Sequence, residues 1–155
     1  MFLIITSVFL LCQISNAQNI NGFVKNFEKT EGVEKIKVGG VLFAIAKMFI
    51  PKDARNAVTK KLTSVEILMS DTFNSEQILG FLNELRSIPS KNGYESLVYV
   101  RDGEDNINVV FERKKEIIKS IIVFIVDESD ICIVRLKGKF KDSDISDLIN
   151  QYVNN

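Results

Sequence analysis

The segment FIVDESDICIV, residues 124–134, places four polar residues between two runs of branched apolar side chains, and three of the four are acids. Such a cluster is typical either of a cation site or of a solvated β-hairpin tip. A calcium loop of the EF-hand kind needs an oxygen ligand at its fifth position, glycine at its sixth and glutamate at its twelfth. Counted from Asp127, these positions hold Ile131, Cys132 and Gly138. The segment therefore predicts a hairpin whose acids stay in water.

Alternating apolar and polar residues extend on both sides of this hairpin, and such alternation is typical of β-strands. Strand patterns cover residues 97–100, 107–111, 121–126 and 132–136, and short polar turns separate them. Consecutive strands with short turns pair as an antiparallel meander. We therefore predict an α+β fold, with an antiparallel four- to five-stranded meander sheet and helices packed on one face.

The first half of the chain contains two more strand patterns, at residues 33–38 and 64–70. The clearest helical pattern spans residues 74–88, where Asn74 and Gln77 have the spacing of a capping box. Other helical patterns cover residues 19–29, 41–50, 53–62 and 145–153, the last with Asp142 or Ser143 as its N-cap.

The amino terminus differs from the rest of the chain because residues 1–18 contain no charged side chain. An apolar stretch there is followed by small residues at Ser15 and Ala17, the −3 and −1 positions of a cleavage site. We predict a cleavable signal peptide at residues 1–17 and a single α+β domain at residues 18–155. A retained membrane anchor or a buried N-terminal helix is the alternative. Cleavage leaves an exported protein, periplasmic or extracellular, with no transmembrane span.

The composition excludes several classes of protein. The 155 residues include 20 basic and 20 acidic side chains, so the chain lacks the basic excess of a nucleic-acid-binding protein. The chain has no histidine, which excludes Ser-His-Asp and Cys-His catalysis and removes the commonest zinc ligand. Cys132, the one thiol left after cleavage, lies between Ile131 and Ile133, as a buried apolar residue would. We predict no catalytic, cofactor-binding or metal-binding residue.

Two weaker motifs also have structural explanations. Asp102, Glu104 and Asp105 are close in sequence at a predicted turn, whereas paired catalytic carboxylates face each other across a cleft. Gly39 and Gly40 precede a predicted helix without the further glycines of a phosphate-binding loop. We therefore predict a loop tip and a strand-to-helix turn at these places.

The apolar segment VLFAIAKMFI, residues 41–50, has more hydrophobic surface than one face of a sheet requires. Such a helix is most often part of the core. If part of it is exposed, it forms a binding face for a protein partner or an apolar ligand. The residues of this predicted interaction face are Leu42, Phe43, Ile45, Met48 and Phe49.

Four stretches in order carry a resemblance to a known family. They are FEKTEGVEKIKVGGVLFAIAK (27–47), KLTSVEILMS (61–70), YESLVYVRDGEDNINVVFERKKEIIKSIIVFIVDESDICIVRLKGKF (94–140) and DISDLI (144–149). In these stretches the chain resembles a bacterial family of exported proteins, domain of unknown function 4252 (DUF4252). The resemblance implies one α+β domain behind an export signal, and it implies no activity, cofactor or catalytic residue.

These observations lead to one functional expectation with two alternatives. We expect an exported bacterial envelope protein that serves as a non-enzymatic binding or interaction module for an envelope protein or an apolar ligand. One alternative is a carboxylate-dependent hydrolase that acts on envelope polymers. The other is an accessory component of envelope stress signalling.

Overall fold

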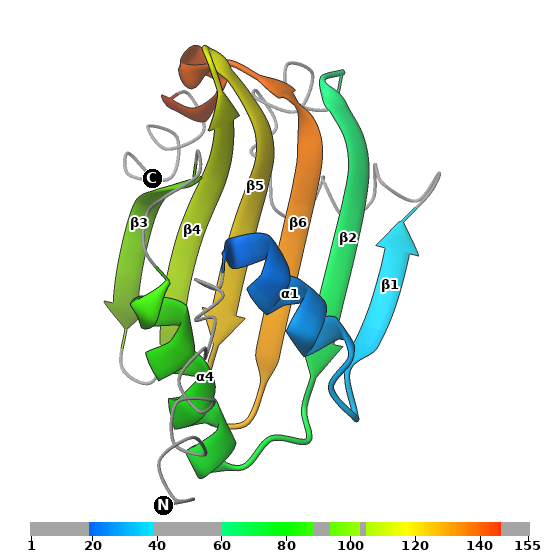
Figure 1. The fold of residues 1–155 in the computed structure, drawn as a ribbon, viewed down its shortest axis with the longest axis vertical. Helices are drawn as coiled ribbons and strands as arrows, with labels where there is room; N and C mark the ends of the chain where they lie inside the picture. The colour runs from blue at the N-terminus through cyan, green and yellow to red at the C-terminus, as the bar shows by residue number, and fades with distance from the viewer. Residues whose placement is uncertain (1–18, 39–59, 89–93, 103–104, 147–155) are drawn as a thin grey trace, which may run out of the picture.

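A computed structural model describes residues 19–38, 60–88, 94–102 and 105–146. In these residues six antiparallel strands form one sheet in the order β1-β2-β6-β5-β4-β3, and helices α1 and α4 cover one of its faces (Figure 1). The elements are α1 (Ile20–Glu28), β1 (Glu34–Val38), β2 (Leu62–Ser70), α4 (Ser75–Ser87), β3 (Tyr94–Asp102), β4 (Asp105–Lys114), β5 (Ile117–Val126) and β6 (Ile131–Phe140). A short helix follows at residues 142–146.

The α+β class and the meander are confirmed, but the sheet is larger than predicted. Strands β3 to β6 pair with their sequence neighbours, as the alternating pattern indicates. Strand β2 then pairs with β6, and β1 pairs with β2, so the sheet has six strands where four or five were predicted. Strand β2 satisfies backbone hydrogen bonds that the free edge of β6 would otherwise expose, and β1 does the same for the edge of β2.

The DESD segment is the tip of the β5–β6 hairpin, as predicted. Val126 and Ile131 are the last paired residues of the two strands. Oδ1 of Asp127 accepts hydrogen bonds from the backbone N–H groups of Ser129, at 3.0 Å, and Asp130, at 2.8 Å. An aspartate that holds its own turn in this way is typical of hairpin loops. Across the described residues, no three His, Cys, Asp or Glu side chains gather closely enough to hold a metal ion.

Helices α1 and α4 begin where the sequence predicts. Asn74 and Gln77 make both hydrogen bonds of a capping box, each at 2.9 Å, at the start of α4. The side chain of Asn19 accepts from the N–H of Gly22 and caps α1. The two helices bury the predicted apolar stripes against the sheet through Ile20, Phe23, Val24, Phe27, Ile78, Phe81, Leu82 and Leu85.

Both faces of the sheet are apolar. Leu68 and Ile133 are paired across β2 and β6 and pack under α1 and α4. The next pair, Ile67 and Val134, points to the opposite face because successive side chains of a strand alternate. The short helix at residues 142–146 adds Ile145 to a second core cluster at the end of the sheet away from α4 (Figure 1). Helices α1 and α4 lie on one face, as predicted, whereas the short helix packs against the other face.

The short helix begins at a different residue from the one predicted. Asp142 or Ser143 was expected to cap it, but both residues are already helical. The backbone N–H of Lys141 instead donates to Oδ2 of Asp144 at 2.7 Å. Asp144 therefore satisfies a free backbone donor at the start of the helix, as the third residue of a capping box does. This frees Asp142 for an ion pair described below.

The prediction of a helix at residues 53–62 is wrong at the C-terminal end of that range. Leu62 belongs to β2 and is paired with Gly138, because strand pairing outweighs the local helical preference. The rest of that helix, the helix at 41–50, and the residues of the closing helix after 146 lie outside the described residues. Within those described residues, no helix combines the length and the hydropathy needed to cross a membrane.

Candidate functional site

The predicted interaction face, Leu42, Phe43, Ile45, Met48 and Phe49, lies outside the described residues, as do Gly39 and Gly40. Among the described residues, a different surface has the features of a binding site. It is an open groove of about 310 Å³ between α1 and α4, called the α1/α4 groove below. Its lining residues are Phe23, Asn26, Phe27, Thr30, Phe73, Gln77, Gly80, Phe81 and Glu84.

The floor of the α1/α4 groove is a cluster of phenylalanine rings. The ring centroid of Phe81 lies 4.8 Å from that of Phe23 and 5.4 Å from that of Phe27. Phe73, which is half-buried, meets Phe27 edge to face at 5.8 Å. Phe124 of β5 supports Phe23 from below at 6.0 Å. Rings packed at these separations hold one another in place, so the floor is formed before any ligand arrives.

Gly80 keeps the groove open. A Cβ atom added at this position would meet no heavy atom within 4 Å, so the space beside the α4 backbone is empty. Glycine inside a helix costs about 1 kcal/mol relative to alanine, and its presence there calls for a reason in packing or function. The neighbouring Leu79 is 60% exposed, so apolar surface continues along α4 beyond the groove. A glycine within an otherwise regular helical stripe is the sequence signal that could have located this site.

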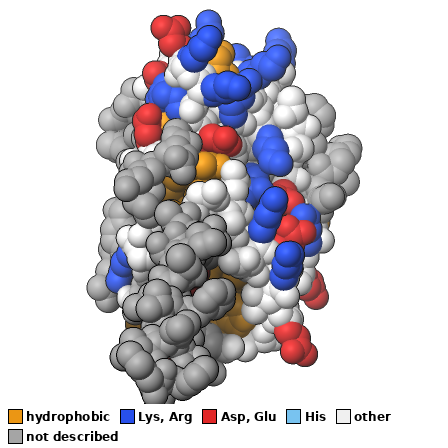
Figure 2. Space-filling model, in the orientation of Figure 1, with side chains coloured by type: hydrophobic (Ala, Val, Ile, Leu, Met, Phe, Trp, Pro, Cys, Tyr) orange, Lys and Arg blue, Asp and Glu red, His pale blue; other side chains and the backbone are white. Residues whose placement is uncertain are grey.

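The rim of the groove is polar. Asn26, Thr30, Gln77 and Glu84 surround the aromatic floor. Figure 2 shows hydrophobic side chains in a recess low on this face of the molecule, with charged side chains mainly elsewhere. An apolar centre with a polar border is the usual composition of a site that docks another protein.

A group of charges lies on the same face of the sheet, beyond α1. Nζ of Lys35 is 2.5 Å from Glu28 and 2.6 Å from Glu66, and Arg135 approaches Glu66 at 3.4 Å. The hydrogen bonds that the Lys35 ammonium donates to the carboxylates of Glu28 and Glu66 raise the pKa of Lys35. Burial alone would raise the pKa of Glu66, but Lys35 and Arg135 outweigh it and lower that pKa. The two cations and the two carboxylates neutralise one another, and the pKa values of Lys35 and Glu66 both shift away from neutral pH.

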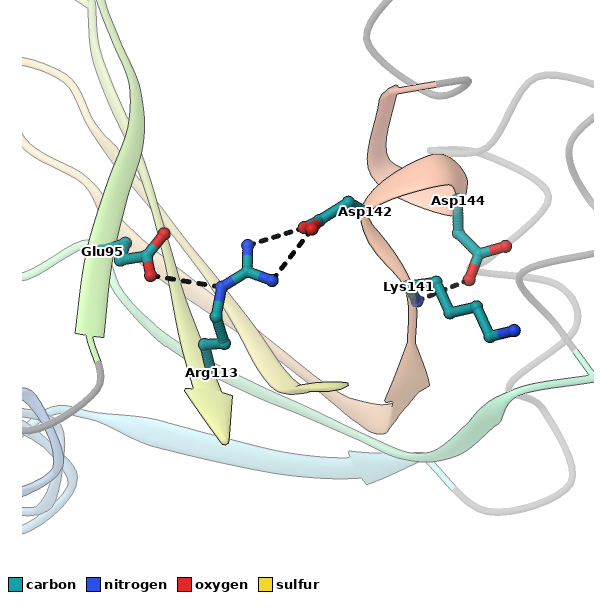
Figure 3. A network of polar contacts seen from close by, with 5 residues as sticks. All are labelled: Glu95, Arg113, Lys141, Asp142 and Asp144. Atoms are coloured by element: carbon teal, nitrogen blue, oxygen red, sulfur yellow. Dashed lines mark hydrogen bonds and ion pairs between the residues drawn. The ribbon is translucent and has the colours of Figure 1, made fainter. Parts of the chain in front are cut away.

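Three further ion pairs lie at the end of the sheet beside the short helix. Arg113 lies between Glu95 and Asp142, with Nε 3.2 Å from the first and Nη2 2.6 Å from the second (Figure 3). The hydrogen bond from Arg113 lowers the pKa of the Asp142 carboxyl. Lys61 pairs with Asp144. The pair with Glu95 joins β4 to β3, and the pairs made by Asp142 and Asp144 join the sheet to the short helix, so the role of all three is structural.

The remaining candidate groups are not assembled into a reactive site. Asp102 and Asp105 face each other as the closing pair of the β3–β4 hairpin, which agrees with a loop tip, while Glu104 lies outside the described residues. Cys132 is half-buried on the sheet face opposite α1 and α4, and burial raises the pKa of its thiol. A thiol with a raised pKa is a poor nucleophile at neutral pH.

Comparison with known proteins gives one match. The model of the family described as domain of unknown function (DUF4252) matches residues 27–148. This range contains the last two residues of α1, all six strands, α4 and the short helix at residues 142–146. No curated protein and no solved structure matches the chain. The match spans most of the sequence and includes most of the lining of the α1/α4 groove, and on this evidence the chain belongs to the DUF4252 family.

Proposed function

We propose that this DUF4252 protein is an exported bacterial envelope protein that binds another envelope protein and catalyses no reaction itself. The α1/α4 groove is the docking site, and its occupant is an aromatic or branched aliphatic side chain on an exposed segment of the partner. One observation carries the proposal. Packed phenylalanine rings form the floor of a groove beside a glycine whose missing side chain leaves room for a guest.

The shape of the groove favours a protein partner over a free small molecule. Small-molecule sites enclose most of their ligand, whereas the α1/α4 groove is open along one side. Protein partners commonly place one large apolar anchor in such a depression and surround it with weaker polar contacts. Here the rings of Phe27 and Phe81 would contact the anchor, and Asn26 and Gln77 would meet the backbone around it.

Export is the second part of the proposal. The uncharged leader at residues 1–17 supports it, because its small residues at positions 15 and 17 suit signal peptidase. A binding module in the periplasm or outside the cell needs no disulfide if its core is large enough. The described residues supply apolar clusters on both faces of the sheet, which fits that condition.

The pKa values of the carboxyl groups favour a binding function over hydrolase activity. A general acid needs a carboxyl with a raised pKa, so that it holds a proton near neutral pH. The carboxyls with shifted pKa values among the described residues, Glu66, Asp142 and Asp144, are all shifted downward by ion pairs. A role in envelope stress signalling is compatible with docking, since a signalling accessory also acts by binding.

A plug in the groove tests the proposal. Gly80→Trp fills the groove with an indole, and Gly80→Ala adds one methyl group to the same helix position. Each variant is produced from the full-length gene, purified after export, immobilised and exposed to a solubilised envelope extract. We expect a protein that wild type and Gly80→Ala retain and that Gly80→Trp loses.

The decisive step uses purified components. The protein retained in this pattern is purified, and its binding to the three forms is titrated by calorimetry. Loss of one buried aromatic anchor costs at least about 2 kcal/mol, so Gly80→Trp is expected to weaken binding by roughly thirtyfold or more. Equal affinity for all three forms would remove the groove as the docking site. Phe43→Ala and Phe49→Ala, in the segment predicted as an interaction face, show in the same titration whether that segment contributes.

A further inference from the structure

A second cavity lies at the other end of α4, apart from the α1/α4 groove. It has a volume of about 170 Å³, and it shares no lining residue with the groove among the described residues. Four aliphatic side chains form one part of its wall, Ile20, Leu85, Ile88 and Val110. Four polar residues form the other part, Arg86, Tyr94, Ser96 and Asn108.

Two buried polar atoms at this cavity have no hydrogen-bond partner of good geometry among the described residues. They are the Oη of Tyr94 and the Oδ1 of Asn108. Tyr94 is only 8% exposed, so solvent does not reach its hydroxyl freely. Buried polar atoms in proteins are nearly always paired, and an exception indicates a bound water, an ion or a ligand. Both atoms belong to residues that line the same cavity, so one guest can satisfy both.

The chemistry of the two atoms defines the guest. Oδ1 of Asn108 only accepts, so the guest must carry an N–H or O–H donor there. Tyr94 faces Glu112 across β3 and β4, and burial of the phenol together with the Glu112 carboxylate raises the pKa of Tyr94 to about 12. The phenol therefore stays protonated, and a second negative charge beside Glu112 would be repelled.

We infer that this cavity binds a neutral primary carboxamide carried on a short aliphatic group. A carboxamide has two N–H donors on one nitrogen and a carbonyl acceptor, so it can serve Asn108 and Tyr94 together. Its aliphatic part lies against Leu85 and Val110. A water occupies about 30 Å³ in the liquid, so the volume holds a group of only a few heavy atoms. Such a group is either a free small amide or the side chain of Gln or Asn from a partner protein.

Three probes of nearly equal size test this inference on the exported protein. Isobutyramide, isobutanol and isobutyrate share one branched aliphatic group and differ in the polar end. Each is titrated while the methyl resonances of Ile20, Leu85 and Val110 are followed by NMR. We expect saturable shifts with isobutyramide and an affinity several-fold weaker for the other two. Equal response to all three, or no saturable response to isobutyramide, overturns the inference and leaves a water-filled cavity.

Two substitutions locate the contact. Tyr94→Phe and Asn108→Leu each remove one unpaired polar atom and keep the approximate size of the side chain, so both variants are expected to fold. Each should weaken isobutyramide binding by roughly three- to tenfold, the effect of one hydrogen bond. Gly80→Trp, in the other site, should leave it unchanged. Unaltered affinity in both cavity variants would contradict the assignment.

A peptide probe distinguishes the two possible sources of the carboxamide, a free small amide and a side chain of a partner protein. Acetyl-Gly-Gln-Gly-N-methylamide presents the Gln side chain, its one primary carboxamide, from an extended backbone, while isobutyramide is free to enter a closed cavity. If the peptide produces the same methyl shifts, and Asn108→Leu abolishes them, the cavity accepts a partner's side chain. If only isobutyramide does so, the cavity takes a free amide. Either result supports a carboxamide site in this cavity. If neither isobutyramide nor the peptide binds, the cavity is not a carboxamide site.

Discussion

The Nζ of Lys61 lies 2.7 Å from both carboxylate oxygens of Asp144, which is 83 residues further along the chain. This pair joins the start of β2 to the short helix after β6. Asp144 is buried, and its Oδ2 also accepts the N–H of Lys141. Burial alone would raise the pKa of Asp144, but the hydrogen bonds from Lys61 and Lys141 together lower it.

The lowered pKa of Asp144 predicts a pH-dependent contribution to stability. A carboxyl with a lower pKa in the folded state stabilises the fold above its unfolded pKa, and the contribution disappears as the pH falls through the folded pKa. The ordinary pKa is 3.8, so the contribution is complete at pH 7 and shrinks below about pH 4. Asp144→Asn should lower the free energy of unfolding by about 1–2 kcal/mol at pH 7, measured by urea titration.

The control for this prediction is Asp142→Asn. Asp142 pairs with Arg113 but is exposed, so its loss should change the free energy of unfolding much less. The gap between wild type and Asp144→Asn should also narrow as the pH is lowered toward 3. A gap that stays constant from pH 7 to pH 3 would mean that the charge of Asp144 does not stabilise the fold.

Two glycine-to-alanine substitutions should have opposite effects. A Cβ at Gly138 would lie 2.5 Å from the backbone oxygen of Lys61 and 2.6 Å from the Phe140 ring, so Gly138→Ala must displace β2 or Phe140. It should destabilise the protein by about 1–3 kcal/mol. Gly80→Ala meets nothing and improves the helix, so it should stabilise by about 1 kcal/mol. Chemical denaturation of both variants beside wild type is the measurement, and two shifts of the same sign would be inconsistent with these backbone positions.

The charge group on β2 and β6 makes a prediction about a buried arginine. Nη1 of Arg135 lies 3.4 Å from Glu66, while the Nε and Nη2 atoms of this guanidinium are buried without a partner among the described residues. Glu66→Gln removes the neutralising charge and should destabilise by about 2–3 kcal/mol. Replacing both residues by leucine should cost less than Glu66→Gln alone, because no unpaired charge remains. A double variant as unstable as the sum of its single variants would show that the two side chains act independently.

Export makes a prediction about the mature terminus. Cleavage after Ala17 should leave Gln18 as the first residue of the protein recovered from the periplasm or the medium. Intact-mass spectrometry measures this directly. Ala17→Leu puts a large side chain at the −1 position and should block processing, since signal peptidase requires a small residue there. A wild-type protein that begins at Met1 would contradict the signal-peptide proposal.

Local features of the fold could be predicted from the sequence, because neighbouring residues determine them. The capping box of α4 depends on Asn74 and Gln77, three residues apart, and the DESD turn depends on Asp127 and the two N–H groups that it accepts. Both were predicted correctly. The meander was predicted for the same reason, since its strands pair with their sequence neighbours.

Features that join distant residues could not be predicted in this way. The pairing of β2 with β6 brings Leu62 beside Gly138, and no local pattern specifies that choice. The same holds for the ion pair of Lys61 with Asp144, which joins residues 83 positions apart. The α1/α4 groove could be predicted only in part. Gly80 is a local sequence signal for it, but the Phe23–Phe81 contact that forms its floor joins residues that only tertiary packing brings together.

The most direct test of the central claim is site-specific photo-cross-linking in living cells. A benzoylphenylalanine at Glu84, on the rim of the α1/α4 groove, is compared with one at Glu116, in the exposed β4–β5 turn. The account predicts a discrete adduct with another envelope protein from position 84, its loss when Gly80→Trp is combined with it, and no such adduct from position 116. The same adducts from both positions, or none from position 84, would contradict a docking site between α1 and α4.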